Sequence, residues 1–264
     1  MPPLLPMHIP YAKMGMYGRS GGMNYSDSYT LRKRGLSALN NNWQTAMMVT
    51  FVAGLLGMVQ STFQLRLDAN SFMNRSVWDF FGHVASSVAP HNGFLTLIAI
   101  LQFLFVSALN IGLNTYFIML HKSENPPFSL LFSRMHVWIK CLGLMLLMGI
   151  FIFLWSLLLV VPGIIAAYRY SMAPYLMAEN PDIDILEAIQ RSKEMMDGNK
   201  GRLFCLHLSF IGWALLSAVV IGLLHAVLGF VGTALGLFAS LALQVYVNSS
   251  VTAFYMELSS QKGV

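Results

Sequence analysis

The chain has 264 residues, of which 56% are hydrophobic and 10% are charged. A soluble globular domain carries roughly 25% charged residues, so this composition excludes an ordinary soluble enzyme. The formal net charge is +5, but the Lys and Arg residues flank apolar segments, whereas a nucleic-acid-binding protein gathers them on a basic face. The composition predicts a compact multi-pass membrane protein that binds no nucleic acid.

Residues 1–30 mix Pro, Gly, Met, Tyr and Ser without a helical or strand period. They contain no apolar core long enough for a signal peptide. We therefore predict a disordered N-terminal tail over 1–30, followed by a membrane domain over 31–264. The alternative is that Met and Tyr side chains of the tail dock on a partner.

Apolar runs long enough to cross a bilayer as a helix, about 20 residues, recur along the rest of the chain. They predict an all-α fold, a polytopic membrane helix bundle of about six transmembrane helices. The expected spans cover residues 44–65, 94–120, 137–161, 164–178, 203–229 and 230–258. Pro162–Gly163 separates the third span from the fourth, which Arg169 and Pro174 interrupt.

The positive charges predict the orientation of these spans. With a cytoplasmic N-terminus, 13 of the 16 Lys and Arg residues lie on the cytoplasmic side. Arg66 and Arg75 then lie outside, and Arg169 lies within the membrane. Because loops rich in Lys and Arg stay in the cytoplasm, both termini are predicted to be cytoplasmic.

The segment 182–197 has the pattern of an amphipathic helix. Its apolar side repeats at helical spacing through Ile185, Ile189, Ser192 and Met196. The opposite side carries polar residues four apart, which pair along a helix. We expect this helix to lie on the cytoplasmic membrane surface. Shorter interfacial helices are expected after Pro126–Pro127 and, on the outer side, over 77–88.

Several motifs carry a resemblance to a known family. They are Tyr170-Ser171-Met172-Ala173-Pro174-Tyr175, Ala178-Glu179-Asn180-Pro181-Asp182-Ile183, Ser192-Lys193-Glu194-Met195-Met196-Asp197-Gly198 and Leu208-Ser209-Phe210-Ile211-Gly212-Trp213. Together they resemble an uncharacterised family of bacterial, mostly Gram-positive, multi-pass integral membrane proteins with a domain of unknown function. The surface helix is also faintly similar to the membrane domain of some glycerophosphodiester phosphodiesterases. The resemblance implies a bacterial plasma membrane and a six-helix fold, and it supplies no catalytic residues.

Arg169 is the main candidate for a polar site inside the membrane. A cation within a span costs about 2.5 to 3.5 kcal/mol to insert and is expected to face the bundle interior or water. Tyr168, Tyr170 and Tyr175 surround it in the sequence. Arg169 either binds an anionic substrate group or a lipid phosphate, or it has a structural role through a buried partner or by snorkelling to the outer interface.

Amide side chains form stripes on two of the spans. Asn110 and Asn114 fall on one face of the second span, and Gln244 and Asn248 fall on one face of the sixth. Such amides either line a hydrophilic path or form interhelical hydrogen bonds. Both uses remain open from the sequence.

Small residues recur on the sixth span at Gly232, Gly236 and Ser240. A ladder of small residues four apart lets two helices approach closely. We expect either packing within the bundle or contact between two copies in a homo-oligomer.

The chain contains no His-Glu-x-x-His zinc motif, no nucleophile elbow and no phosphate-binding loop. We therefore expect no enzyme, no metal and no cofactor. The first hypothesis is a non-enzymatic accessory or scaffold protein, which binds membrane lipids and a membrane or envelope partner through its tail or its amphipathic helices. The alternative is a small transporter or permease for an anionic or peptide-like substrate, with a polar site near Arg169.

Overall fold

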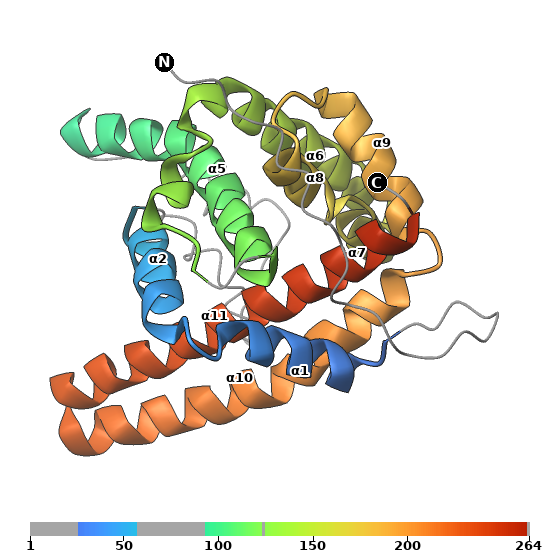
Figure 1. Ribbon diagram of the computed structural model, residues 1–264. Coiled ribbons are helices and arrows are strands. Elements are labelled where there is room, and N and C mark those ends of the chain that lie inside the picture. The colour runs from blue at the N-terminus through green and yellow to red at the C-terminus, as the bar shows by residue number, and fades with distance from the viewer. Residues whose placement is uncertain (1–25, 57–92, 123–124, 263–264) are drawn as a thin grey trace.

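The computed structural model describes residues 26–56, 93–122 and 125–262 (Figure 1). These residues form helices and turns, with no strand among them, so the all-α prediction is confirmed for the described part of the chain. The expected tail up to residue 25, the end of the first span over 57–65 and the outer interfacial helix over 77–88 lie outside these residues.

Two short helices open the described chain. α1 (Ser28–Leu39) begins at Asp27, whose carboxylate accepts a hydrogen bond from the Ser28 amide at 2.8 Å. After a turn at 40–42 the chain enters α2 (Trp43–Leu56). α1 packs closely on the last helix of the bundle, because a Cβ at Gly35 would lie only 2.8 Å from the backbone nitrogen of Ser250.

A long central helix and a shorter apolar helix follow. α5 (Gly93–Lys122) lies between α2 and α6 in Figure 1. The segment after Pro126–Pro127, expected to be a short helix, forms the 3₁₀ turns η1 (Phe128–Phe132) and η2 (Met135–Val137) and leads into α6 (Trp138–Leu158). η1 packs against α5 at Gly112, where a Cβ would lie 2.0 Å from the carbonyl oxygen of Leu131.

α6 and α7 (Val160–Tyr170) form a hairpin joined by a single extended residue, Leu159. The chain breaks again at 171–172, and α8 (Ala173–Glu179) begins with Pro174 in its first turn. Proline suits this position because its missing amide hydrogen needs no partner there. The range expected to be one span, 164–178, therefore consists of two helices.

α9 (Ile185–Met196) lies within the range expected to be amphipathic, 182–197. Asp184 caps it by accepting a hydrogen bond from the Leu186 amide at 3.2 Å. Its buried residues are Ala188, Ile189, Ser192, Met195 and Met196. This side packs against α7 and α8, so α9 covers the bundle with its apolar side and does not offer that side to lipid.

α10 (Lys200–Leu228) and α11 (Phe230–Lys262) form the longest hairpin. They lie side by side as the orange and red helices of Figure 1. The turn between them is a single residue, Gly229, whose φ of 56° is a left-handed conformation that favours glycine.

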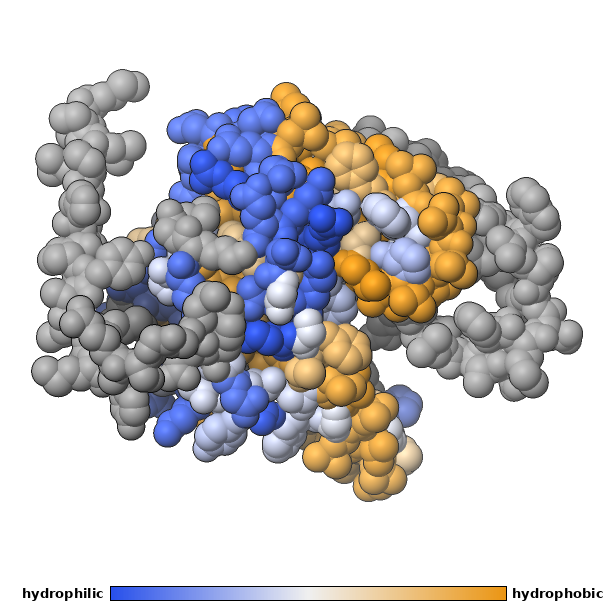
Figure 2. Space-filling model, turned by 90° about the vertical axis from the view of Figure 1, so that its right-hand side faces the viewer, coloured by the Kyte–Doolittle hydropathy of each residue, from blue (hydrophilic) through white to orange (hydrophobic). Residues whose placement is uncertain are grey.

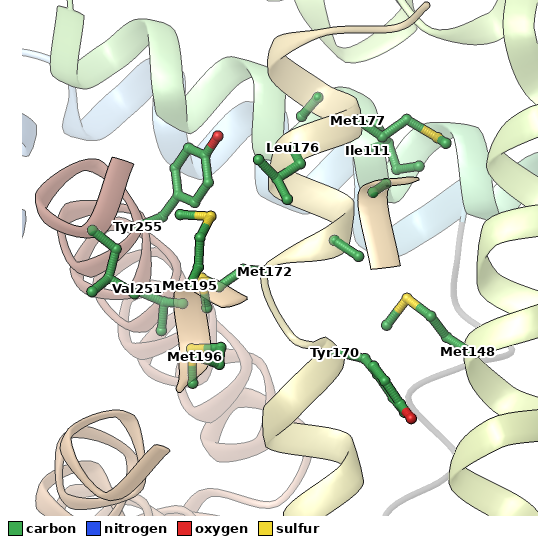
Figure 3. Close-up of a cluster of buried hydrophobic side chains, with 14 of the residues drawn as sticks. Ile111, Met148, Tyr170, Met172, Leu176, Met177, Met195, Met196, Val251 and Tyr255 are labelled. Carbon is green, nitrogen blue, oxygen red and sulfur yellow. The ribbon is translucent and has the colours of Figure 1, made fainter. Parts of the chain in front are cut away.

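The core holds a large cluster of buried apolar side chains where α8, α9 and α11 meet. Figure 3 shows Met172, Met195 and Met196 on the side of Val251 and Tyr255, with Met177 beside Ile111. Methionine fills irregular gaps because its side chain is unbranched and flexible. Burying each such side chain stabilises the fold by about 1.5 to 3 kcal/mol.

Much apolar surface stays outside this core. At the tip of the α6–α7 hairpin Leu158, Leu159 and Val160 are 72%, 67% and 71% exposed. Figure 2 shows hydrophobic residues beside a separate hydrophilic region. Among the described residues, three stretches are long and apolar enough to cross a membrane: Leu104–Lys122, Phe128–Leu158 and Lys200–Leu228. These features are those of a membrane protein.

Candidate functional site

The charged residues gather where the long helices begin and end. Glu257, near the end of α11, accepts hydrogen bonds from Arg34 Nη1 at 3.0 Å and from Arg202 Nη2 at 2.5 Å. The backbone amide of Ser26 donates to the same carboxylate at 3.1 Å. The Glu257 side chain is 6% exposed, and a carboxylate this buried needs cations and donors to replace its hydration. The cluster therefore holds α1, α10 and α11 together.

A second carboxylate, Glu179 at the end of α8, joins two further helices. It forms an ion pair with Lys122 at the end of α5. The hydroxyl of Tyr255 donates to Glu179 Oε2 at 2.6 Å. Tyr255 also stacks on Tyr175, with ring centroids 5.2 Å apart. Tyr255 and Glu257 lie within one turn of α11, so both carboxylate clusters are attached to the same end of this helix.

Two more cations hold the backbone between α8 and α9. Arg134 donates through Nη2 to the carbonyl oxygen of Ala178. Lys140 Nζ donates to the carbonyl oxygens of Pro181 and Asp182 at 3.3 and 3.0 Å. Carbonyl groups at a helix end carry partial negative charge and lack helical partners. These basic side chains therefore fix the end of α8 and the start of the segment that leads to α9.

A serine from α9 closes the break between α7 and α8. The Ser192 hydroxyl donates to the carbonyl oxygen of Arg169 at 3.0 Å and accepts from the amide of Met172 at 3.2 Å. Ser192 is fully buried. Interrupting a helix leaves backbone groups without partners, which is costly in an apolar interior. One hydroxyl satisfies two of them here, so α9 is tied to the break.

Arg169 and the three tyrosines near it in the sequence have different neighbours in the structure. Arg169 is exposed at the end of α7. Tyr168 contacts the rings of Phe204 and His207 on α10. Tyr170 is buried and contacts the ring of Phe151 on α6, whereas Tyr175 stacks on Tyr255 of α11. The four predicted residues do not converge on one site.

The amide stripes bond along their own helices. Asn110 Nδ2 donates to the carbonyl oxygen of Val106 at 3.1 Å, one turn earlier on α5. Asn114, one turn later, is half-buried. On α11, Gln244 Nε2 donates to Asn248 Oδ1 at 3.1 Å. Each stripe therefore contains a hydrogen bond within its own helix.

Two residues of the small-residue ladder face α10. A Cβ at Gly232 would lie 2.0 Å from the carbonyl oxygen of Leu224, and a Cβ at Gly236 would lie 2.7 Å from the Ile221 side chain. Ser240 is exposed. The two glycines thus lie within the α10–α11 hairpin, where they permit close packing of its two helices.

The groups that bind metals do not gather in the described part of the chain. Over residues 26–56, 93–122 and 125–262, no three His, Cys, Asp or Glu residues lie close enough to hold an ion. An open groove lies beside Arg202, lined in part by Asp27, Gly198, Gly201 and Cys205. Arg202 already binds Glu257 there.

Sequence reasoning did not predict that Glu257 joins three helices or that Ser192 joins α9 to the break between α7 and α8. Glu257 is the only acidic residue after Asp197, and a lone carboxylate at the end of a long uncharged run is a signal for a specific partner. Ser192 gave a weaker signal: it is a hydroxyl on the otherwise apolar side of α9. The break that it closes depends on how α9 folds back over α7, which local periodicity does not describe.

Comparison with known proteins agrees with the motif resemblance over the C-terminal part of the chain. Residues 156–262 match a family described as "Protein of unknown function (DUF975)". The match begins near the end of α6 and includes all of α7, α8, α9, α10 and α11. It confirms the expected likeness to an uncharacterised family for these residues. No curated protein and no solved structure matches the chain.

Proposed function

We propose that the chain is a multi-pass protein of the bacterial plasma membrane, with about six spans and both termini in the cytoplasm. Both apolar hairpins, α6–α7 and α10–α11, turn at uncharged tips. The opposite end carries clusters of Lys and Arg around Glu179 and Glu257. Because positively charged segments stay in the cytoplasm, the charged end faces that side.

Within this membrane the protein acts as a non-enzymatic accessory or scaffold protein, which binds lipids and a membrane or envelope partner. The supporting observation is the way α9 packs on the bundle. Its apolar side and Ser192 fix it to the bundle, while its outer side carries the Glu187–Arg191 ion pair at 2.7 Å and a Gln190–Glu194 hydrogen bond at 2.8 Å. A polar helix face held rigidly over a membrane bundle suits protein docking, because a segment that is already ordered loses little conformational entropy on binding.

One observation favours the alternative, a small transporter for an anionic or peptide-like substrate near Arg169. The stretch from α7 to α8 is interrupted at 171–172, and interrupted helices form the binding sites of many transporters. The separate neighbours of Arg169, Tyr168, Tyr170 and Tyr175 favour the accessory role instead.

The test is affinity purification of the full chain in mild detergent, followed by mass spectrometry of all bound proteins and small molecules. The accessory role predicts a stoichiometric protein partner. A variant with Glu187→Ala, Arg191→Ala and Glu194→Ala should lose this partner, whereas the exposed Ser217→Ala change on α10 should keep it.

The transporter predicts a different result from the same purification. A polar metabolite or peptide would remain bound without a protein partner, and Arg169→Ala would release it at an unchanged yield of folded protein. That outcome would overturn the accessory role. Size-exclusion chromatography of each variant measures the yield of folded protein.

A further inference from the structure

An apolar stripe on α7 ends in a positive charge. Val161, Ile165 and Arg169 are four residues apart and therefore share one side of the helix. The first two are 65% and 49% exposed, and Arg169 is also exposed. The stripe starts at the apolar tip of the α6–α7 hairpin and runs toward α9.

A second cation lies next to the end of this stripe. Ser192 binds the carbonyl oxygen of Arg169, and Lys193 follows it on α9. The Lys193 ammonium lies 5.8 Å from the ring centroid of Tyr170, the residue after Arg169. Within the described ranges no carboxylate forms an ion pair with Arg169 or Lys193. Two cations therefore share this part of the surface without a protein anion bound to them.

The depth of this site follows from its contact with α10. Tyr168 contacts Phe204 and His207, which lie just after Arg202, where the long uncharged stretch 203–256 begins. Arg169 thus lies at the same level as the boundary between the charged first turn of α10 and its long uncharged part. Lipid phosphates lie at this level when an apolar helix enters a bilayer.

We propose that an anionic phospholipid of the cytoplasmic leaflet binds here, its phosphate held between Arg169 and Lys193 and an acyl chain along Val161 and Ile165. This site deepens the proposed function, on which it rests, by naming the lipid class and its position. A guanidinium binds phosphate oxygens through two parallel hydrogen bonds. The apolar stripe that continues from the cations favours a lipid over a soluble phosphate compound.

The experiment uses the full chain in mild detergent, mixed with equal amounts of phosphatidylglycerol and phosphatidylcholine. Native mass spectrometry counts the lipids of each kind that remain bound. We expect the wild type to prefer phosphatidylglycerol, and the double variant Arg169→Gln, Lys193→Gln to lose about 30-fold of this preference, since each basic side chain near an anionic surface contributes about fivefold.

Two controls separate the site from general charge and from folding. Arg191→Gln removes a cation from the same helix, but one paired with Glu187, and it should keep the preference. The charge-conserving double variant Arg169→Lys, Lys193→Arg should keep most of it. An unchanged preference in the Gln double variant would overturn the proposal, and so would loss of bound phosphatidylglycerol on addition of soluble glycerol 3-phosphate.

The outcomes also separate this proposal from the accessory role. If the Gln double variant loses lipid preference while no protein partner is captured, the lipid site stands and the accessory role fails. If a partner is captured but the lipid preference does not depend on Arg169 and Lys193, the accessory role stands and the lipid site fails.

Discussion

At the scale of single residues, the fold depends on two buried polar side chains that each join several elements. Glu257 binds Arg34 and Arg202 from two other helices. Ser192 binds backbone groups on either side of the α7–α8 break. Both lie where a side chain must replace contacts with water, so removing either leaves its partners without equivalent bonds.

We predict that Glu257→Gln lowers the free energy of unfolding by about 3 kcal/mol. The change leaves two guanidinium groups without the carboxylate that offsets their charge, and breaking a buried pair in this way is costly. Unfolding of the purified protein by increasing sodium dodecyl sulfate measures the effect.

The matched control is Glu187→Gln on α9. Its ion pair with Arg191 is 2.7 Å long but its side chain is 48% exposed, so we expect a change of only about 0.3 to 0.5 kcal/mol. Equal effects of the two substitutions would contradict a special role for Glu257.

Ser192→Ala should destabilise the protein by about 1 to 3 kcal/mol, because the Arg169 carbonyl and the Met172 amide lose their shared partner. The thermal unfolding midpoint in detergent reports this change. Ser217→Ala, which removes a hydroxyl bonded only within α10 at an exposed position, should leave the midpoint nearly unaltered. A harmless Ser192→Ala would show that the break needs no closure by α9.

At the scale of elements, close approach of helices depends on glycines at particular contacts. Gly112 allows η1 to pack on α5, and Gly232 allows α10 and α11 to pack together next to their turn. In contrast, Gly222 on α10 has nothing near the position of a Cβ. The space around each glycine, set by the neighbouring helix, separates Gly112 and Gly232 from Gly222. No local sequence pattern indicates this difference.

Gly232→Ala should therefore destabilise the hairpin by about 1 to 3 kcal/mol, because the added methyl group overlaps the Leu224 carbonyl. Gly222→Ala should be neutral or stabilising by up to about 1 kcal/mol, since alanine favours the helix. Thermal unfolding of both variants tests the pair. Equal loss of stability would indicate that helix contact at Gly232 is unimportant.

The sequence predicted elements more fully than it predicted their contacts. Uncharged apolar runs and the side-chain period indicated helices, and the described residues form helices joined by turns, with no strand among them. Arg169 shows where this reasoning stops: the sequence placed it within the fourth span and left its neighbours open. In the structure the chain turns at Leu159 and α9 packs on α7, so that Ser192 of α9 binds the Arg169 carbonyl oxygen. The preceding residue, Tyr168, contacts the first turns of α10.

The same limit applies to the amides and tyrosines. Spacing places Asn110 and Asn114 on one helix face, but it does not say which helix lies opposite. Likewise, three tyrosines within eight residues of sequence point to α6, α10 and α11. Such contacts depend on long-range packing, which a single sequence does not contain as a local pattern.

At the scale of the whole molecule, charge is segregated from apolar surface. Cationic side chains surround Glu179 and Glu257, whereas the hairpin tips expose Leu, Val and Ile. α10 has 29 residues, so it is about 43 Å long and exceeds the roughly 30 Å of a bilayer's hydrocarbon core. The α10–α11 hairpin is therefore long enough to carry its turn to the other side of a membrane.

Cysteine labelling should show opposite exposure of the two ends. In a background with Cys141→Ala and Cys205→Ala, Val231→Cys near the α10–α11 turn should react with a membrane-impermeant maleimide in intact cells. Leu186→Cys on the exposed side of α9 should react only after the cells are opened. The reverse pattern would invert the orientation, and protection of Val231→Cys in intact cells would show that this turn does not cross.

The single-residue turn at Gly229 has a consequence for how the protein enters the membrane. Between residues 203 and 256 the chain has no Lys, Arg, Asp or Glu, and the turn adds no polar loop. Moving a charged side chain through the bilayer centre costs about 2.5 to 3.5 kcal/mol, a cost that this segment avoids entirely. During biosynthesis α10 and α11 can thus enter the lipid, and their turn can cross it, without moving any Lys, Arg, Asp or Glu side chain of 203–256 through the apolar interior.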